Sequence, residues 1–245
     1  MLWNKELIRF LVVSRASQRI FDFFKVINME MPRRLEEYFE LARQLYQTGP
    51  SHDFSHIERV FRLSLTIGRS ENADLEIIGI AALFHDIARE EENTSGGLIC
   101  HAAASAERTR KLLIERMLER GKIEAICACI ATHRFRDHND PQTLEAKCLF
   151  DADKLDSLGA VGIARAYLWL GERGGTVYVA QEIWEQTDFE SNRPEEDSLQ
   201  REWHIKLRNV KDCLYTQTAR QIAAKRHQTM KNFLSVLESE VLGEE

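Results

Sequence analysis

Helix-breaking residues are scarce in this 245-residue chain, which contains only 4 prolines and 12 glycines. Because both residues interrupt regular helices, their scarcity favours a mostly helical fold. No apolar run reaches the ~18–20 residues that a membrane-spanning helix requires. The most apolar segment, near the N-terminus, is interrupted by Arg9, Arg15, Arg19 and Asp22, and it lacks the small-residue cleavage site of a signal peptide. We therefore expect a protein without a membrane span.

An excess of positive charge is also absent, because the formal net charge is -6. Nucleic-acid duplexes are bound by net basic surfaces, so a duplex is not an expected partner. A small phosphorylated substrate that a few local cations hold is compatible with this charge. The composition leaves the oligomeric state open.

The 5 cysteines show no pattern of a disulfide or zinc framework. Their number is odd, and Cys127 and Cys129 are separated by one residue rather than by the two of a CxxC motif. We interpret all of them as reduced thiols, which is typical of an intracellular protein. The predicted location is therefore cytoplasmic.

Helical periodicity of apolar residues dominates the chain and predicts an all-α fold. We predict helices over roughly 3–27, 32–48, 53–70, 74–90, 100–120, 122–134, 142–157, 159–171, 178–186, 198–214 and 216–240. Residues 1–28 are expected to form a helical extension, and residues 29–245 a single domain. The segment of about 171–198 contains three glycines and an acidic stretch. It is predicted to be either a flap over a site or a solvated connector. The apolar stretch "AYLWLG" is expected to lie in the core.

Several predicted helices carry a histidine or an aspartate on the face that should be buried. His56, for example, aligns at helical spacing with Val60, Leu63 and Ile67. The same spacing predicts that further residues also face inward: His85, Asp86, His133, Asp153 and Asp156. Burying such groups costs several kcal/mol unless they are paired or bind a metal. Any one of them could be a satisfied core residue, but imidazoles and carboxylates from separate helices suit a divalent transition metal in a helical bundle.

Three stretches together resemble the HD superfamily of metal-dependent phosphohydrolases. They are "SHDFSHIERV", with the first histidine, "LFHDIARE", with the His-Asp pair, and "DADKLDSLGAVGIARAY", with the last aspartate. Their order and spacing are similar to those of a bacterial subfamily of small single-domain HD hydrolases, over residues 32–240. The resemblance implies an HD-type helical bundle with a metal site in its core.

The resemblance also implies which residues hold metal. His56, His85, Asp86 and Asp153 match the ligands of a first ion. His101 and His133 match positions that hold a second ion in members with two, although His101 could instead be an ordinary helix N-terminal residue and His133 a core histidine. We therefore expect one or two divalent ions, with Mn, Fe, Co, Ni or Zn favoured by mixed N and O ligands and Mg also possible.

Catalytic and substrate-binding roles are expected for several polar residues near these ligands. Asp86 and Arg89 are the predicted catalytic residues, although Arg89 could instead pair with Glu90 or Glu92. The predicted substrate-binding residues are Arg59, Asp156, Arg165 and Lys206. For Arg59 the alternative is a structural ion pair. Asp156 could instead be a general acid/base or accept a hydrogen bond from a ligand histidine. Asp53 is predicted to support a ligand histidine in the same way, or to cap its helix.

The expected function is that of a phosphohydrolase that cleaves a phosphoester or phosphoanhydride bond, in a nucleotide or a related small phosphorylated metabolite. One alternative is an HD-type di-iron oxygenase, for which the six predicted ligands would supply the required set. A second alternative is a non-catalytic HD binding or signalling module, which does not need intact ligands.

Overall fold

The described part of the chain, in a computed structural model, comprises residues 33–46, 54–134, 139–186 and 197–244. These ranges contain helices and no strand, so the predicted all-α fold is confirmed for them. The α-helices are α2 (Arg33–Leu45), α3 (Phe54–Glu71), α4 (Leu75–Phe84), α5 (Arg89–Thr94), α6 (His101–Glu115), α7 (Arg120–Ala131), α8 (Leu144–Leu155), α9 (Gly159–Arg173), α10 (Gln181–Gln186), α11 (Leu199–Ile205) and α12 (Gln217–Leu242), with a 3-10 helix, η2 (Leu207–Asp212). The helix predicted at 3–27, and with it Asp53, lies outside the described residues.

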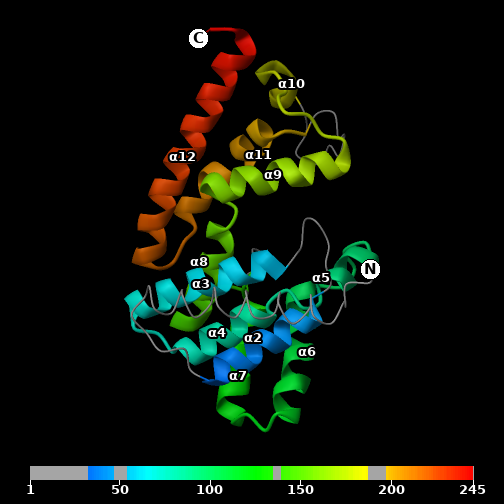
Figure 1. Cartoon of the computed structure of the whole chain (residues 1–245), viewed down its shortest axis with the longest axis vertical. Coiled ribbons are helices and arrows are strands. Elements are labelled where there is room, and N and C mark those ends of the chain that lie inside the picture. Colours follow the sequence, from blue (N-terminus) through cyan, green and yellow to red (C-terminus); the bar gives the residue numbers. More distant parts are fainter. Residues whose placement is uncertain (1–32, 47–53, 135–138, 187–196, 245) are drawn as a thin grey trace, which may run out of the picture.

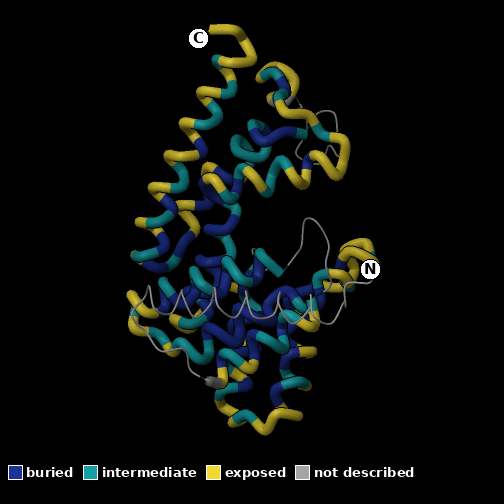
Figure 2. Tube along the Cα trace, in the orientation of Figure 1, coloured by how far each residue is buried: buried dark blue, intermediate teal, exposed yellow. Residues whose placement is uncertain are grey.

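The helices form two groups, which α8 connects (Figure 1). Helices α2 to α7 form one group, and α9, α10, α11 and α12 form the other. Helix α4 lies in the middle of the first group and contacts α2, α3, α6, α7 and α8. Its residues from Ile78 to Phe84 are all buried, as expected for a helix that is apolar on every side. Figure 2 shows that buried residues concentrate in this first group, whereas α12 exposes much of its length.

The structure differs from the sequence prediction at the His-Asp pair. A single helix was predicted over 74–90, but α4 ends at Phe84, and α5 begins at Arg89 after a tight turn. Within this turn the amide of Ile87 donates to the carbonyl of Phe84 (3.3 Å), and the amide of Ala88 donates to Ser105 Oγ (3.1 Å) on α6. A partner on another helix thus replaces the next helical hydrogen bond. The turn lets His85 and Asp86 lie together at the end of α4.

A second predicted helix, over 198–214, is also interrupted. Helix α11 ends at Ile205, and the chain continues as the 3-10 helix η2.

The turn between α8 and α9, earlier in the chain, depends on two glycines. Gly159 has a φ of +74°, and a Cβ at Gly162 would lie 2.1 Å from the carbonyl oxygen of Ser157. These glycines allow the turn that follows Asp156 to pack closely against α9.

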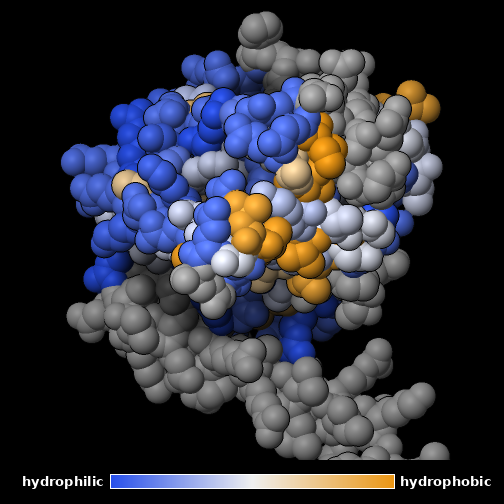
Figure 3. Space-filling model, turned by 90° about the horizontal axis from the view of Figure 1, so that it is seen from above, coloured by the Kyte–Doolittle hydropathy of each residue, from blue (hydrophilic) through white to orange (hydrophobic). Residues whose placement is uncertain are grey.

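No helix within the described ranges combines the length and the apolarity that crossing a membrane requires. Figure 3 looks onto the end of the molecule that carries α10 and the last turns of α12. Most of this face is hydrophilic, with a narrower band of hydrophobic groups. The exposed apolar side chains of these two elements include Ile183, Val241 and Leu242.

Candidate metal centre

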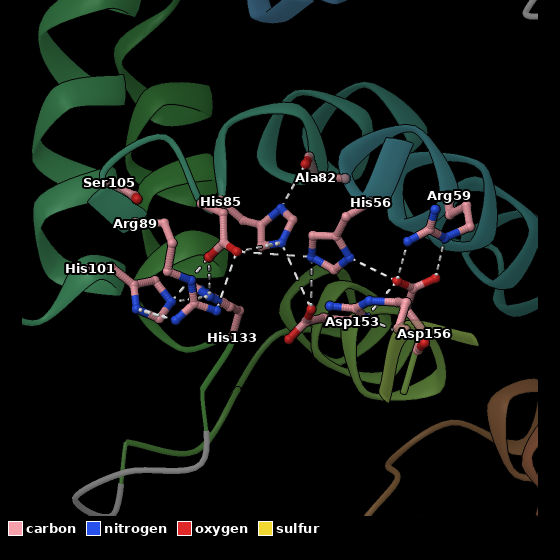
Figure 4. Close-up of polar contacts among 12 residues, drawn as sticks. His56, Arg59, Ala82, His85, Arg89, His101, Ser105, His133, Asp153 and Asp156 are labelled. Atoms are coloured by element: carbon pink, nitrogen blue, oxygen red, sulfur yellow. Dashed lines mark hydrogen bonds and ion pairs between the residues drawn. The ribbon is translucent and has the colours of Figure 1, made fainter. Parts of the chain in front are cut away.

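Six side chains that the sequence singled out as ligands lie together between the helices of the first group and α8. They are His56 on α3, His85 and Asp86 in the turn after α4, His101 at the start of α6, His133 just after α7, and Asp153 on α8. Figure 4 shows that the four histidines and Asp153 point toward one another from different parts of the bundle. Two overlapping triads, His56–His85–Asp153 and His85–Asp86–His133, each have ligand atoms within 4.8 Å of one another. This spacing is compatible with coordination of a cation.

The first half of the cluster consists of two imidazoles and two carboxylates. Asp153 Oδ1 lies 3.5 Å from His56 Nε2 and 3.8 Å from His85 Nε2. Asp86 Oδ2 lies 3.9 Å and 4.0 Å from the same two nitrogens. Ligands that each lie ~2.1 Å from one ion are about 3–4 Å apart, so these four atoms fit a single cation.

The second half of the cluster uses the other oxygen of Asp86. Asp86 Oδ1 lies 3.1 Å from His101 Nε2 and 3.5 Å from His133 Nε2. The two nitrogens are themselves only 3.1 Å apart. Asp86 therefore directs one oxygen toward each half, an arrangement suited to a carboxylate that bridges two ions.

All four histidines direct Nε2 into the cluster, because Nδ1 has an acceptor in every case. His56 Nδ1 lies 2.8 Å from Asp156 Oδ2, and His101 Nδ1 lies 2.6 Å from Glu92 Oε2. The Nδ1 atoms of His85 and His133 lie 2.8 Å and 2.6 Å from the carbonyl oxygens of Ala82 and Ile130, respectively. Carbonyls and carboxylates only accept, so we assign the proton to Nδ1 and the lone pair to Nε2. Arg89 Nη1, a donor, also lies 2.9 Å from His101 Nδ1, and there the assignment follows the shorter contact with Glu92. Four lone pairs thus point at the positions that ions would take.

Two buried atoms in the cluster have no hydrogen-bond partner, His85 Nε2 and Asp86 Oδ1. The 3.1 Å contact between Asp86 Oδ1 and His101 Nε2 lacks hydrogen-bond alignment. A buried polar atom without a partner costs about 1–3 kcal/mol. A cation would satisfy both atoms, and it would also lie between the facing lone pairs of His101 and His133. The residues present therefore fit a divalent metal, as expected for an HD domain.

Electrostatics give the cluster the protonation states that a metal requires. Burial lowers the pKa of His85 from 6.5 to about 4, so its imidazole is neutral at pH 7. Burial on its own would raise the pKa of Asp86, but His85 and the Arg89 guanidinium, 3.3 Å away, hold that pKa well below its usual value. Burial on its own would also raise the pKa of Asp153, but Lys154 together with the facing histidines lowers it. Neutral imidazoles and ionised carboxylates are the forms that bind metals.

The depressed pKa of His85 predicts that the metal-free protein loses stability as the pH falls from 6.5 to about 4. In this window the unfolded chain binds a proton at position 85 and the folded chain does not, so the free energy of unfolding decreases by up to about 3 kcal/mol. Urea denaturation of EDTA-treated protein at several pH values measures this. The His85→Gln variant should show a shallower slope over the same window, and identical slopes would contradict the prediction.

Asp156 lies behind His56 rather than among the six residues. Its carboxylate accepts from Arg59 Nε (2.8 Å) and Nη2 (3.0 Å), and from Arg165 Nη1 (2.7 Å), as well as from His56. Burial raises the pKa of Asp156, but the hydrogen bonds from His56 and Arg59 outweigh burial and lower it. Asp156 thus holds His56 in its orientation, and Arg59 forms the structural ion pair that was its alternative role. Whether these residues also contact substrate stays a prediction.

Of the remaining predicted residues, Arg89 contacts the cluster directly. Arg89 contacts Asp86, and its Nη1 lies 3.1 Å from Glu92 Oε2, so the predicted pairing with Glu92 is also present. Lys206 is exposed, pairs with Glu202 at 3.2 Å, and lies beside Arg165 in the wall of a cavity outside the cluster. Asp53 lies outside the described residues.

The sequence did not identify two residues that support the ligands. The buried carboxylate of Glu92 binds His101 Nδ1 with one oxygen, while its other oxygen accepts from Arg134 Nη1 (2.5 Å). Lys154 Nζ donates to the carbonyl oxygen of His133 (3.0 Å) and to Asp153 Oδ2 (2.8 Å). Glu92 lies outside the three stretches that resemble the family. Lys154 lies in the third stretch, directly after Asp153, but its contact with His133 depends on the packing of α8 against the end of α7.

The position of Glu92 predicts that Glu92→Gln weakens ion binding in the second half of the cluster. Loss of a group that orients a ligand histidine typically reduces metal affinity about 10–100-fold, and His56, His85 and Asp153 do not contact Glu92. Calorimetric titration with Mn²⁺ should show one weakened site and one unchanged site. Glu91→Gln, the same change on a more exposed neighbour that pairs with Arg108, should leave both sites intact. Equal titrations for wild type and Glu92→Gln would contradict the role.

Comparisons with known proteins agree with this geometry. The model of the HD domain family matches residues 53–158, which include all six clustered side chains. YpgQ of Bacillus subtilis strain 168, an uncharacterised protein, is 32% identical over 203 residues, covering 81% of this chain and 89% of YpgQ. The crystal structure of YpgQ in complex with ADP superimposes with a TM-score of 0.66 at 28% identity, covering 86% of this chain and 100% of that one.

Two further structures are described as HD-superfamily hydrolases. One, a predicted hydrolase from an uncultured Thermotogales bacterium, has 27% identity and a TM-score of 0.60, covering 84% of this chain and 92% of that one. The other, from Bacillus thuringiensis, has 26% identity and a TM-score of 0.65, covering 85% and 96%. These similarities extend well beyond the matched domain and include the second group of helices. The chain therefore belongs to the HD superfamily of hydrolases.

Proposed function

We propose that this protein is a metal-dependent phosphohydrolase that cleaves a phosphoester or phosphoanhydride bond in a nucleotide or a related small phosphorylated metabolite. The observation that carries the proposal is the position of Asp86, which directs one oxygen toward His56 and His85 and the other toward His101 and His133. The structure of the relative YpgQ with ADP supports a phosphorylated ligand.

The carboxylates among the ligand residues supply negative charge for metal binding and do not act as general bases. Bound divalent metal would supply acidified water and polarise a phosphoryl oxygen. The pKa values of Asp86 and Asp153 are below their usual range, so neither carboxylate is an effective proton acceptor at neutral pH. Their role is to stay ionised and hold the cations, which makes hydrolysis dependent on the metal.

Arg89 is the residue of this chain best placed to neutralise a phosphoryl group at the centre. Its guanidinium contacts Asp86 and Glu92, yet 30% of its side chain is exposed, so an incoming anion can reach it. Hydrogen bonds from a guanidinium to phosphoryl oxygens are charge-assisted and stabilise the charge that develops during cleavage. Asp86 and Glu92 keep Arg89 in place before substrate binds.

The test is a screen for phosphate release with Mn, Co, Ni and Mg, on nucleoside mono-, di- and triphosphates, cyclic nucleotides and non-nucleoside phosphate esters. Each reaction is run with and without inorganic pyrophosphatase, because cleavage at an inner anhydride releases pyrophosphate. The cyclic nucleotides are assayed with added alkaline phosphatase, because opening of the cyclic ester leaves the phosphate on the nucleoside. We expect release that requires added metal and is absent from the His85→Ala variant. If no substrate gives release above that variant, the proposal is wrong.

The di-iron oxygenase alternative requires the same six side chains, and the structure brings these together. Elemental analysis of freshly purified protein separates the two activities. Two irons per chain, with oxygen-dependent loss of substrate, would favour the oxygenase, whereas other metals with phosphate release support the hydrolase. The non-catalytic alternative predicts neither activity.

A further inference from the structure

A cavity of about 400 Å³ lies between α9 and the α11–η2 segment, beside the turn that follows α8. Polar residues in its wall include Ser157, Arg165, Ser198, Glu202 and Lys206. The cavity falls in the size range of small-molecule sites, ~300–1,000 Å³. None of the six clustered side chains lines it, so it is a separate space for another part of a ligand.

The cavity is connected to the metal centre through the Asp156–Ser157 turn. Ser157 lines the cavity, and Asp156, the preceding residue, binds His56 of the cluster at 2.8 Å. Arg165 belongs to both places, because it lines the cavity and donates to Asp156 Oδ2 at 2.7 Å. A ligand that enters the cavity therefore lies one side chain away from the group that orients His56.

Positive charge is in excess at this connection. The single carboxylate of Asp156 binds two guanidinium groups, those of Arg59 and Arg165. A third, that of Arg226, donates to the carbonyl oxygen of the neighbouring Leu155 (2.6 Å) and interacts electrostatically with Asp156. Three guanidinium groups thus surround the one carboxylate of Asp156, a local excess of positive charge. Phosphate oxygens are the natural ligands for such a place.

The other lining residues of the cavity include apolar and aromatic side chains. Trp169, one helical turn after Arg165 on α9, lines the cavity together with Ala166, Leu170, Leu199 and Leu207. The Trp169 residue is 37% exposed, so part of its indole is accessible to a ligand. The guanidinium of Arg173 lies 4.1 Å above the indole ring but does not line the cavity, so it holds the ring without occupying the cavity side.

We propose that this cavity binds the nucleoside of a nucleotide, with the base against Trp169 and the phosphate chain extending past Arg165 toward the metal centre. A flat aromatic base suits the indole, because stacking tolerates any base and adds affinity. Ser198 and Glu202 offer hydroxyl and carboxylate groups for the polar edge of the base or for the ribose. This proposal rests on the proposed function for the direction of the phosphates, and it names the nucleoside as the part of the substrate that sets selectivity.

The test compares binding of ADP with binding of inorganic pyrophosphate, which carries the same phosphates without a nucleoside. Calorimetry of the full-length protein with Mn²⁺ gives both affinities without requiring turnover. We expect Trp169→Ala to lower ADP affinity about 10–100-fold. The ratio of ADP affinity to pyrophosphate affinity should fall accordingly, and Trp169→Phe should recover most of the loss. Leu168→Ala, a truncation of a 57%-exposed neighbour outside the cavity, should match the wild type.

The outcomes distinguish this inference from the proposed function. If ADP binds wild type and Trp169→Ala equally, or binds wild type no better than pyrophosphate, the nucleoside site is wrong even when phosphate release is observed. If Trp169 is required for ADP binding but no substrate is hydrolysed, the nucleoside site stands and the hydrolase proposal fails. Circular dichroism of each variant verifies that it is folded before the affinities are compared.

Discussion

Asp86→Asn is expected to reduce metal-dependent phosphate release at least about 1,000-fold, because the metal contributes several kcal/mol of transition-state stabilisation. Asp86 directs one oxygen toward each half of the cluster. An amide in its place has no negative charge, and only one of its two terminal atoms can be a ligand. One ion would therefore lose its Asp86 ligand, and the other would keep only a neutral carbonyl oxygen in its place.

The same variant should remain folded. Asn fills the space of Asp, and Arg89 keeps its contact with Glu92 at 3.1 Å. Steady-state kinetics, metal content and urea denaturation are measured in parallel, with Asp212→Asn, an exposed carboxylate on η2, as the matched control. Normal turnover in an Asp86→Asn variant that has lost its metal would show that hydrolysis occurs elsewhere.

The largest effect on stability is expected from Asp151→Ala. The buried carboxylate of Asp151 accepts from the amides of Tyr215 (2.9 Å) and Thr216 (2.7 Å) and from Thr216 Oγ1 (2.7 Å). Thr216 is also the N-cap of α12, so Asp151 fixes the start of that helix to α8. Its removal leaves buried donors without a partner. Burial raises the pKa of Asp151, so desolvation offsets part of the gain, and we expect a loss of about 2–4 kcal/mol.

Asp153 offers a matched comparison on the same helix. Asp151 and Asp153 are two residues apart on α8, so their side chains differ by about 200° in direction around the helix axis. We expect Asp151→Ala to lower the urea midpoint while the folded fraction still binds metal, and Asp153→Asn to lose metal with little change in the metal-free midpoint. A loss of less than about 1 kcal/mol in Asp151→Ala would contradict the role of Asp151 as an anchor.

The local sequence pattern predicted that several residues of the cluster face the interior. Helical spacing predicted that His56, His133 and Asp153 face the interior, and in the structure all three lie in the cluster. His101 could not be derived in this way, because it is the first residue of α6 and belongs to no apolar stripe. Its inclusion came from the resemblance to the family, and its proximity to Asp86 depends on how α5 and α6 pack.

Features that depend on partners distant in the sequence could not be predicted from local patterns. The break after Phe84 requires Ser105 Oγ to receive the amide of Ala88, and the role of Asp151 requires donors 64 and 65 residues later. The expectation that "AYLWLG" is core was wrong for Leu168 and Trp169, which are 57% and 37% exposed. Periodicity indicates that a helix has an apolar face, but not whether a neighbour covers it.

The six clustered residues come from segments that are far apart along the chain, from α3 to α8. An ion held among them acts as a reversible cross-link that ties these segments together only in the folded state. Chelation would then remove a restraint on chain opening as well as a catalyst. We expect protease resistance to rise and fall with metal supply, so that metal-starved cells would contain less of this protein as well as a less active form of it.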